Sequence, residues 1–100
     1  MDALTVLAEP TRRRIVDALR LSESSVGDLA TALDMSQPAI SKHLRVLRVA
    51  GVVSSHPVAQ QRIYRLEPAA FQELDEWLTP YRLLWIRHFD KLARHLDEKE

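Results

Sequence analysis

The sequence of 100 residues contains no cysteine and only two glycines. Without cysteine, this chain cannot form disulfides, Cys-ligated zinc or iron–sulfur centres, or a catalytic thiolate. Its longest stretch without a formal charge, residues 49–61, holds two Ser, a His, a Pro and two Gln. Such a stretch cannot span a bilayer, and the early acids Asp2 and Glu9 do not fit a signal peptide. We therefore expect a cytoplasmic protein with no membrane partner.

Catalytic motifs are missing as well. The sequence has no Gly-rich phosphate-binding loop and no catalytic grouping of Ser, His and carboxylate residues. We therefore predict no enzyme activity, no catalytic residue and no cofactor. The composition is that of an ordinary globular protein, 46% hydrophobic, without a linker, repeat or low-complexity tract. These features predict a single domain over residues 1–100, with a core in residues 1–67 and a terminal helix in residues 68–97.

Positive charge gathers in the middle of the sequence, although the whole chain has a formal net charge of zero. Residues 66–100 carry five Lys and Arg against eight Asp and Glu. The window from residue 35 to residue 66 has no carboxylate and holds five cations: Lys42, Arg45, Arg48, Arg62 and Arg65. Such a window predicts a polyanionic partner such as nucleic acid. A solvated surface with a chance excess of cations is the alternative.

Capping residues and apolar spacing predict three helices in the first half of the chain, after a short segment around Leu4 and Leu7. Pro10 suits the start of the first helix, Ser25 caps the second and Ser36 caps the third. Their inward stripes are Ile15, Val16 and Leu19; Val26, Leu29, Ala30 and Leu33; and Ile40, Leu44 and Leu47.

The turn between the second and third helices is short, consisting of Asp34 and Met35 before the cap. Two helices joined in this way predict a helix-turn-helix. The third helix ends at Gly51, where a left-handed conformation is expected to bring Val52 against Leu47.

A hairpin follows the third helix, with predicted strands Val52–Val58 and Arg62–Leu66 that are rich in β-branched and aromatic residues. Alternation along the second strand predicts that Ile63, with Leu66, faces the core, while Arg62 and Tyr64 face outward.

The pattern is helical again from Pro68 to about Asp97, with a kink or a break at Thr79–Pro80. The predicted fold class is therefore mainly α with a small β-hairpin. It is a winged helix-turn-helix with a long, Pro80-interrupted C-terminal dimerisation helix.

The outward face of the third helix carries the strongest functional signal. Its side chains are cationic, small or flat, and none is acidic: Gln37, Pro38, Ser41, Lys42, Arg45 and Arg48. Cations suit phosphates, and an amide pairs well with adenine in the major groove. We therefore predict that this helix reads double-stranded DNA. His43 lies at the margin, either as a half-buried, hydrogen-bonded side chain or as a DNA contact.

The hairpin adds Arg62, which suits the phosphate backbone or the minor groove. The alternative is an arginine that covers apolar surface. A different class of function, a winged helix that binds protein, does not explain why the recognition face excludes acids.

The terminal helix has an apolar stripe that is broader than a helix needs to pack against one small domain. Residues with spacing three and four form a seam, widened by further apolar residues: Phe71, Leu74, Leu78, Tyr81, Trp85, His88 and Leu92, with Trp77, Leu84, Phe89 and Leu96. This pattern predicts a homodimer interface. Its expected residues are Leu4, Leu7, Leu74, Trp77, Leu78, Tyr81, Trp85 and Phe89.

Four segments resemble the ArsR-type winged-helix regulators: Leu7–Arg12, Val26–Ala30, Ser36–Leu47 and Ala50–Val53. The resemblance runs in register from about Leu4 to Leu66. It implies a dimeric prokaryotic DNA-binding regulator, usually a repressor. It also implies that the DNA-recognition positions fall on Ser36 to Arg45 and that the wing arginine is Arg62. It does not identify a small-molecule effector.

The sequence departs from this family in three places. It lacks the cysteine pair of the metal sensors, it has Asp34 where glycine is common, and its wing tip is Ala59-Gln60-Gln61 without glycine. The terminal helix looks like that of the metal-independent branch. Its possible metal ligands are poorly spaced, so we predict no metal site: His88, Asp90, His95, Asp97 and Glu98.

Overall fold

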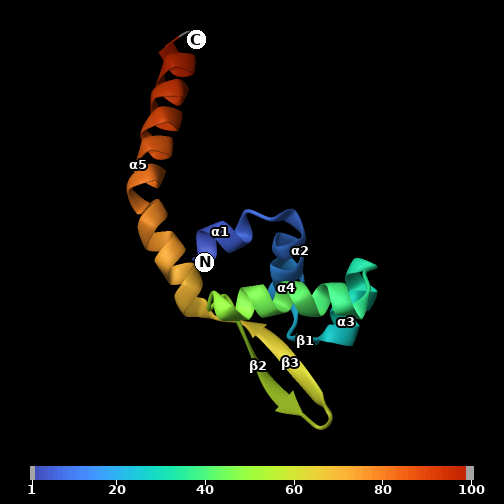
Figure 1. The fold of residues 1–100 in the computed structure, drawn as a ribbon. Helices are drawn as coiled ribbons and strands as arrows, with labels where there is room; N and C mark the ends of the chain where they lie inside the picture. Colours follow the sequence, from blue (N-terminus) through green and yellow to red (C-terminus); the bar gives the residue numbers. More distant parts are fainter. Residues whose placement is uncertain (1, 99–100) are drawn as a thin grey trace.

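The computed structural model describes residues 2–98, except for the side chain of residue 98. Along the chain lie α1 (Ala3–Leu7), α2 (Pro10–Leu21), β1 (Ser24–Ser25), α3 (Val26–Leu33), α4 (Gln37–Val49), β2 (Val53–Val58), β3 (Gln61–Leu66) and α5 (Pro68–Glu98). Figure 1 shows α2, α3 and α4 packed together, with the hairpin extending to one side and α5 projecting away. The predicted fold class, mainly α with a small hairpin and a long terminal helix, is confirmed.

Side chains cap the three helices of the core: Ser25 and Ser36 are the predicted caps, and Glu9 is a cap that the sequence analysis did not predict. The carboxylate of Glu9 accepts a hydrogen bond from the backbone N–H of Arg12 at 2.9 Å. Ser25 Oγ accepts from the N–H of Asp28 at 3.1 Å, and the Asp28 carboxylate accepts in return from the Ser25 N–H, which completes a capping box. Ser36 Oγ caps α4 by accepting from the N–H of Ala39 at 3.3 Å.

Two residues with positive φ end the helices of the helix-turn-helix. Asp34 ends α3 at φ 54°, a conformation that Asp tolerates better than most residues. Gly51 follows α4 at φ 79°. Its N–H donates to the carbonyl of Arg48, and the N–H of Val52 donates to the carbonyl of Leu47, both at 3.0 Å. This is the Schellman arrangement predicted for Gly51.

The core is formed by the predicted inward stripes. Its largest fully buried side chains come from α1 to α4 and from the start of the wing: Val6, Ile15, Leu29, Ile40, Leu44, Leu47, Val52 and Val53. Each such side chain contributes about 1.5–3 kcal/mol by leaving water. Ala70 and Phe71 of α5 also pack here, so the terminal helix is attached to the core at its base.

The sheet has one strand more than the predicted hairpin. Its order is β1-β3-β2, and β1 pairs antiparallel with β3 through Ser24↔Tyr64 and Ser25↔Ile63. Two serines carry no strand pattern, so local sequence could not reveal β1. The extra pairing attaches the middle of β3 to the segment directly before α3.

The predicted orientation of Tyr64 is wrong. Tyr64 and Leu66 pack against the core, while Ile63 is not in that cluster and Arg62 is exposed. The physical reason is the period of two in a strand: Leu66 and Tyr64 share a face, whereas Leu66 and Ile63 cannot.

Ala59 has a positive φ of 55° at the wing tip, where the turn lacks glycine. Gly51 also has a positive φ, of 79°, and a Cβ added to Gly51 would meet no other atom within 4 Å. Backbone strain alone therefore distinguishes alanine from glycine at residue 51. We expect Gly51→Ala to lower the free energy of unfolding by about 1–2 kcal/mol and Ala59→Gly to raise it by up to about 1 kcal/mol. Urea denaturation measures both changes; equal effects of the two substitutions would contradict this account.

α5 runs through Pro80 without a break, so of the two predicted alternatives the break is excluded. Figure 1 shows the helix bending along its length. Near the proline, Thr79 Oγ1 and Arg82 Nη2 each donate to the carbonyl of Asp75 at 2.8 Å. With 31 residues at about 1.5 Å each, α5 accounts for most of the 63 Å length of the molecule. No helix within residues 2–98 is long and apolar enough to cross a membrane.

Candidate nucleic-acid interface

α4 divides sharply into a buried and an exposed side. Ile40, Leu44 and Leu47 have no exposed surface. The side chains predicted on the outward side of this helix, together with its cap, are all exposed: Ser36, Gln37, Pro38, Ser41, Lys42, Arg45 and Arg48. The helix thus presents amide, hydroxyl and cationic groups to solvent in one continuous surface, which we call the α4 face.

The cations of the α4 face have no acidic partner. Within residues 2–98, the ion pairs shorter than 4 Å use His43, Arg65 and Arg82 as their cations. Lys42, Arg45 and Arg48 are in none of them, and neither is Arg62. Unpaired cations retain their full attraction for a polyanion, because no neighbouring carboxylate has to be displaced.

The wing lies close to the first turn of α4. One surface hollow is lined by residues from the start of α3, from the start of α4 and from β3: Ser25, Val26, Gly27, Gln37, Gln61 and Arg62. Gln37 and Arg62, predicted separately as recognition and wing residues, therefore line the same hollow. Sequence reasoning did not place Ser25, Val26 and Gly27 beside the wing, because only the fold brings these residues together.

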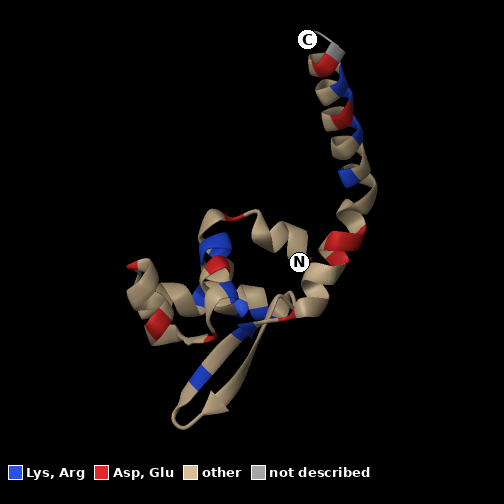
Figure 2. Cartoon of the chain, turned by 180° about the vertical axis from the view of Figure 1, so that it is seen from behind, with Lys and Arg blue, Asp and Glu red and all other residues tan. Residues whose placement is uncertain are grey.

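The two arginines of β3 differ in their surroundings. Arg62 is exposed and donates to Ser55 Oγ at 3.3 Å. Arg65 donates to Ser54 Oγ at 3.3 Å and lies 3.8 Å from the carboxylate of Glu67. Figure 2 shows these basic segments along the hairpin, with acidic residues only at its base. Arg62 is therefore the wing cation that is free of an acidic neighbour.

His43 is half-buried, with 23% of its side chain exposed. Its Nδ1 lies 3.8 Å from the carboxylate of Glu9, which is near enough for attraction but too far for a hydrogen bond. The pKa of the Glu9 carboxyl group is lowered, mainly by the hydrogen bond from the Arg12 N–H and in part by His43. This pair links the start of α2 to the middle of α4, which gives His43 a structural contact on the inner margin of the α4 face.

The three consecutive arginines of α2 all donate to backbone carbonyls. Arg12 Nε donates to Val6 at 2.7 Å, Arg13 to Leu7 at 3.1 Å, and Arg14 to Leu33 at 3.2 Å. Leu7 and Leu33 are the last residues of α1 and α3, whose final carbonyls have no partner within their helices. These arginines therefore join neighbouring helix ends to α2.

The comparisons with known proteins agree with one another. The model of the bacterial regulatory protein, arsR family, matches residues 9–55, from the cap of α2 into β2. The HTH-type transcriptional regulator Rv2034 of Mycobacterium tuberculosis is 36% identical to this chain, and the match covers 97% of the chain and 88% of the relative. The transcriptional repressor SdpR of Bacillus subtilis is 36% identical over 75% of the chain and 83% of the relative. The chain belongs to the arsR family.

Solved structures extend the similarity over nearly the whole arsR-family fold. The crystal structure of a possible transcriptional regulator for arsenical resistance matches with a TM-score of 0.72 and 41% identity, over 93% of this chain and 94% of that one. An ArsR-like transcriptional regulator from Rhodococcus sp. RHA1 also matches with a TM-score of 0.72 and 30% identity, over 91% of this chain and 86% of that one. This arsR-family protein is therefore a DNA-binding transcriptional regulator and not an enzyme.

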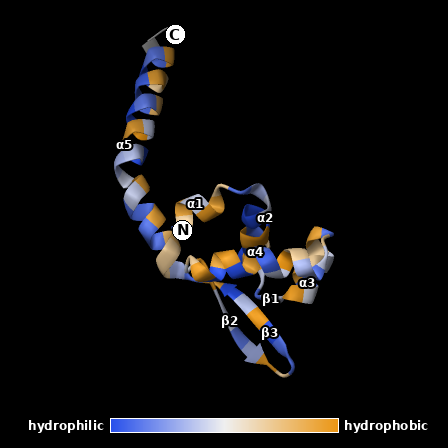
Figure 3. Cartoon of the chain, viewed as in Figure 1, coloured by the Kyte–Doolittle hydropathy of each residue, from blue (hydrophilic) through white to orange (hydrophobic). Residues whose placement is uncertain are grey.

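α5 exposes the apolar stripe predicted for dimerisation. The exposed fraction is 53% for Trp77, 45% for Tyr81, 57% for Trp85 and 65% for Phe89. Leu74 and Leu78 are half-buried, while on α1 Leu4 is exposed and Leu7 packs partly on the core. Figure 3 shows hydrophobic segments continuing along α5 far beyond the helical core. α1 lies beside the base of α5, and a hollow between them is lined by residues that include Leu4, Leu74 and Trp77.

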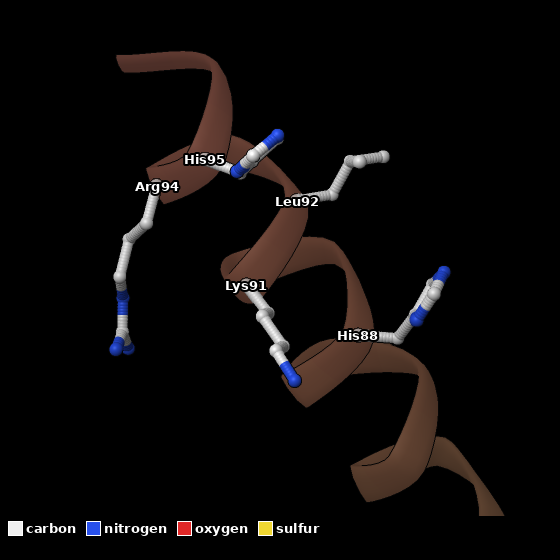
Figure 4. Close-up of a pocket in the computed structure, with 5 residues that line it drawn as sticks. All are labelled: His88, Lys91, Leu92, Arg94 and His95. Carbon is white, nitrogen blue, oxygen red and sulfur yellow. The ribbon is translucent and has the colours of Figure 1, made fainter. Parts of the chain in front are cut away.

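The possible metal ligands in the described part of this arsR-family chain do not gather. Among the residues that the structure describes, no group of three or more His, Asp or Glu side chains is placed to hold a metal ion. His88 and His95 line one shallow surface of α5 with Lys91, Leu92 and Arg94 (Figure 4). The side chain of Glu98, a further candidate, lies outside the described part.

Proposed function

We propose that this chain binds a two-fold operator in double-stranded DNA as a homodimer and represses transcription from it. α4 lies in the major groove, and the wing places Arg62 on the phosphate backbone or in the minor groove. Because such a regulator works where bacterial DNA lies, we assign it to the cytoplasm. Relatives named as repressors, SdpR and the arsenical resistance operon repressor of Escherichia coli, support the direction of control.

The α4 face carries this proposal. It is exposed, contains unpaired Lys42, Arg45 and Arg48, and has no carboxylate. The side chain of Gln37 at its start is long enough to pair with an adenine edge, and Ser41 is small enough to allow close approach to bases. Lys42 and Arg45, further along, suit the phosphates that flank the groove. The hollow shared by Gln37 and Arg62 makes the wing continuous with this surface.

The homodimer is argued from the α5 stripe. A soluble monomer rarely exposes a contiguous apolar patch as large as one with two Trp, a Tyr, a Phe and several Leu. A second copy offers the same stripe, and an interface around a two-fold axis is self-complementary by symmetry. The predicted anchors Trp77, Tyr81 and Trp85 are the aromatic type that dominates interface energies. Two linked α4 faces then contact two half-sites together.

Binding to a random DNA duplex at increasing salt tests the α4 face. We expect the logarithm of the binding constant to fall linearly with the logarithm of salt, by about 0.9 for each phosphate contact. Arg45→Ala is expected to weaken binding and to reduce this slope. Arg87→Ala removes the same charge from α5, far from the α4 face, and serves as the matched control.

Fluorescence anisotropy with a labelled duplex measures both quantities. Binding that does not depend on salt, or equal losses for the two variants, would contradict DNA binding through the α4 face. Such a result would favour the other candidate class, a winged helix that binds protein. Sequencing the genomic fragments retained by the protein then identifies the operator.

Metal is not expected to control operator binding. The reason is the absence of cysteine and of any grouped metal ligands in residues 2–98. Anisotropy titrations of the operator with zinc and with a chelator should therefore overlay. A tenfold shift between them, equal to about 1.4 kcal/mol of coupling, would contradict the prediction and restore His88 and His95 as ligands.

A further inference from the structure

Two histidines interrupt the apolar stripe of α5. His88 follows Trp85 by three residues, Leu92 follows His88 by four, and His95 follows Leu92 by three. All four positions therefore continue the stripe. Figure 4 shows His88, Leu92 and His95 on the same side of the helix, whereas Lys91 and Arg94 point in other directions. Both imidazoles therefore belong to the surface that the proposed dimer covers.

Of the four residues one helical turn from His88, three are apolar and one is a cation. One helical turn before His88 lie Leu84 and Trp85, and one turn after it lie Lys91 and Leu92. Leu84 and Trp85 are each more than half exposed in the single chain, so these side chains are available to a second copy. A partner that covers them takes His88 out of water with them.

The charged groups near the two histidines all come from α5. In the described part of the chain α5 stands alone at this level, without another element packed against it (Figure 1). Its charged side chains here are Arg87, Asp90, Lys91, Arg94 and Asp97. In this set three cations stand against two acids, on each copy of the chain. Beyond His95 the sequence continues with Glu98, which makes His95 the weaker candidate of the two.

We propose that dimerisation through α5 is sensitive to pH, because His88, assisted by His95, must be neutral in the dimer. This inference rests on the homodimer proposed above. Histidine is the side chain whose ordinary pKa, about 6.5, places its charge change between pH 5 and 8. Burial among apolar groups and a nearby lysine both disfavour the charged imidazole.

The direction of the effect follows from proton linkage. An apolar interface disfavours a charged imidazole, so the separated chains bind more protons than the dimer. The dimer is therefore fully stable above the pKa of the free histidine and weakens as the pH falls below it. A histidine with the ordinary pKa is roughly nine-tenths protonated at pH 5.5. We expect the dissociation constant of the dimer to rise about tenfold or more between pH 7.5 and pH 5.5.

Analytical ultracentrifugation of the full chain at these two pH values, with a chelator present, tests the proposal. His88→Gln removes the titrating group and is expected to abolish most of the pH dependence, while His95→Gln abolishes a smaller part. His56→Gln, on the half-buried histidine of β2, is the matched control and should retain the full dependence. Far-UV circular dichroism at both pH values checks that the chains remain folded.

The outcomes separate this inference from the proposed function. A chain that is monomeric at pH 7.5 overturns the homodimer and this inference with it. A dimer whose dissociation constant changes less than threefold down to pH 5.5 overturns the inference alone. A pH effect that persists in the His88→Gln/His95→Gln variant, or that accompanies loss of the circular dichroism signal, also overturns it.

Discussion

Replacing Trp85 by Glu is expected to convert the dimer into monomers and to remove most of the operator affinity. Trp85 lies in the middle of the α5 stripe with 57% of its surface exposed, and it belongs to no core cluster of the single chain. A buried tryptophan anchor is worth about 2 kcal/mol or more at an interface, and a buried carboxylate adds a desolvation cost. Loss of the second half-site then lowers operator affinity by about 10²–10⁴.

Leu83→Glu is the matched control for this substitution. Leu83 is 50% exposed and lies two residues before Trp85, hence on a different side of α5. The Leu83→Glu substitution introduces the same charge but should leave the dimer and operator binding intact. Sedimentation velocity measures the oligomeric state, and anisotropy measures the affinity. Equal behaviour of the two variants would show that the stripe is not the interface.

Truncation after Glu67 is expected to have a still larger effect. It removes the whole stripe together with Ala70 and Phe71, which pack on the core. The remaining winged helix should be monomeric or insoluble, with much weaker operator binding. A stable dimer of the truncated chain, observed by sedimentation, would refute the assignment of the interface to α5.

Replacing Gln37 by Ala should reduce operator affinity by about 1–3 kcal/mol and leave binding to random DNA nearly unchanged. Gln37 is exposed in the first turn of α4 and lines the hollow shared with Arg62. Residues at the start of a recognition helix contact base edges, so the loss should relax the preference at one base pair of each half-site. Gln72→Ala, at an exposed glutamine of α5, is the control that should change nothing.

Lys42→Ala should behave differently because Lys42 is assigned to the phosphates. It is expected to weaken operator and random DNA alike, and to reduce the salt slope by about one for each phosphate that a subunit no longer neutralises. Centres of the two half-sites should lie roughly 34–36 Å apart, or a multiple of that distance. If Gln37→Ala weakened both kinds of DNA equally while Lys42→Ala changed base preference, the two roles would be exchanged.

The sequence by itself determined the helices, their caps and the inward stripes. These features depend on neighbours three or four residues apart, so they are present in local sequence. Ser25 with Asp28 forms the predicted capping box, Gly51 the predicted helix end, and Ile40, Leu44 and Leu47 the predicted buried side of α4. The exposed and carboxylate-free α4 face follows from the same periodicity.

Only the tertiary structure decided the features that depend on residues distant in sequence. β1 exists because Ser24 and Ser25 pair with β3, some 40 residues away. Tyr64 turns inward because Leu66 is held against the core on the same face of the strand. Arg14 donates to Leu33 only because α2 and α3 pack together. Periodicity within one element contains no information about such contacts, because they arise when elements dock.

The candidate site divides in the same way. Sequence periodicity and charge identified the α4 face and Arg62 separately, since each depends on its own element. The packing of the wing beside α3 and α4 decided that Gln37, Gln61 and Arg62 line one hollow. Arg62 lies in the carboxylate-free window of the sequence, while Arg65 lies close to Glu67, two residues further along the chain. Sequence therefore determined the chemistry of the groups offered to DNA, and tertiary packing determined which of them meet on one surface.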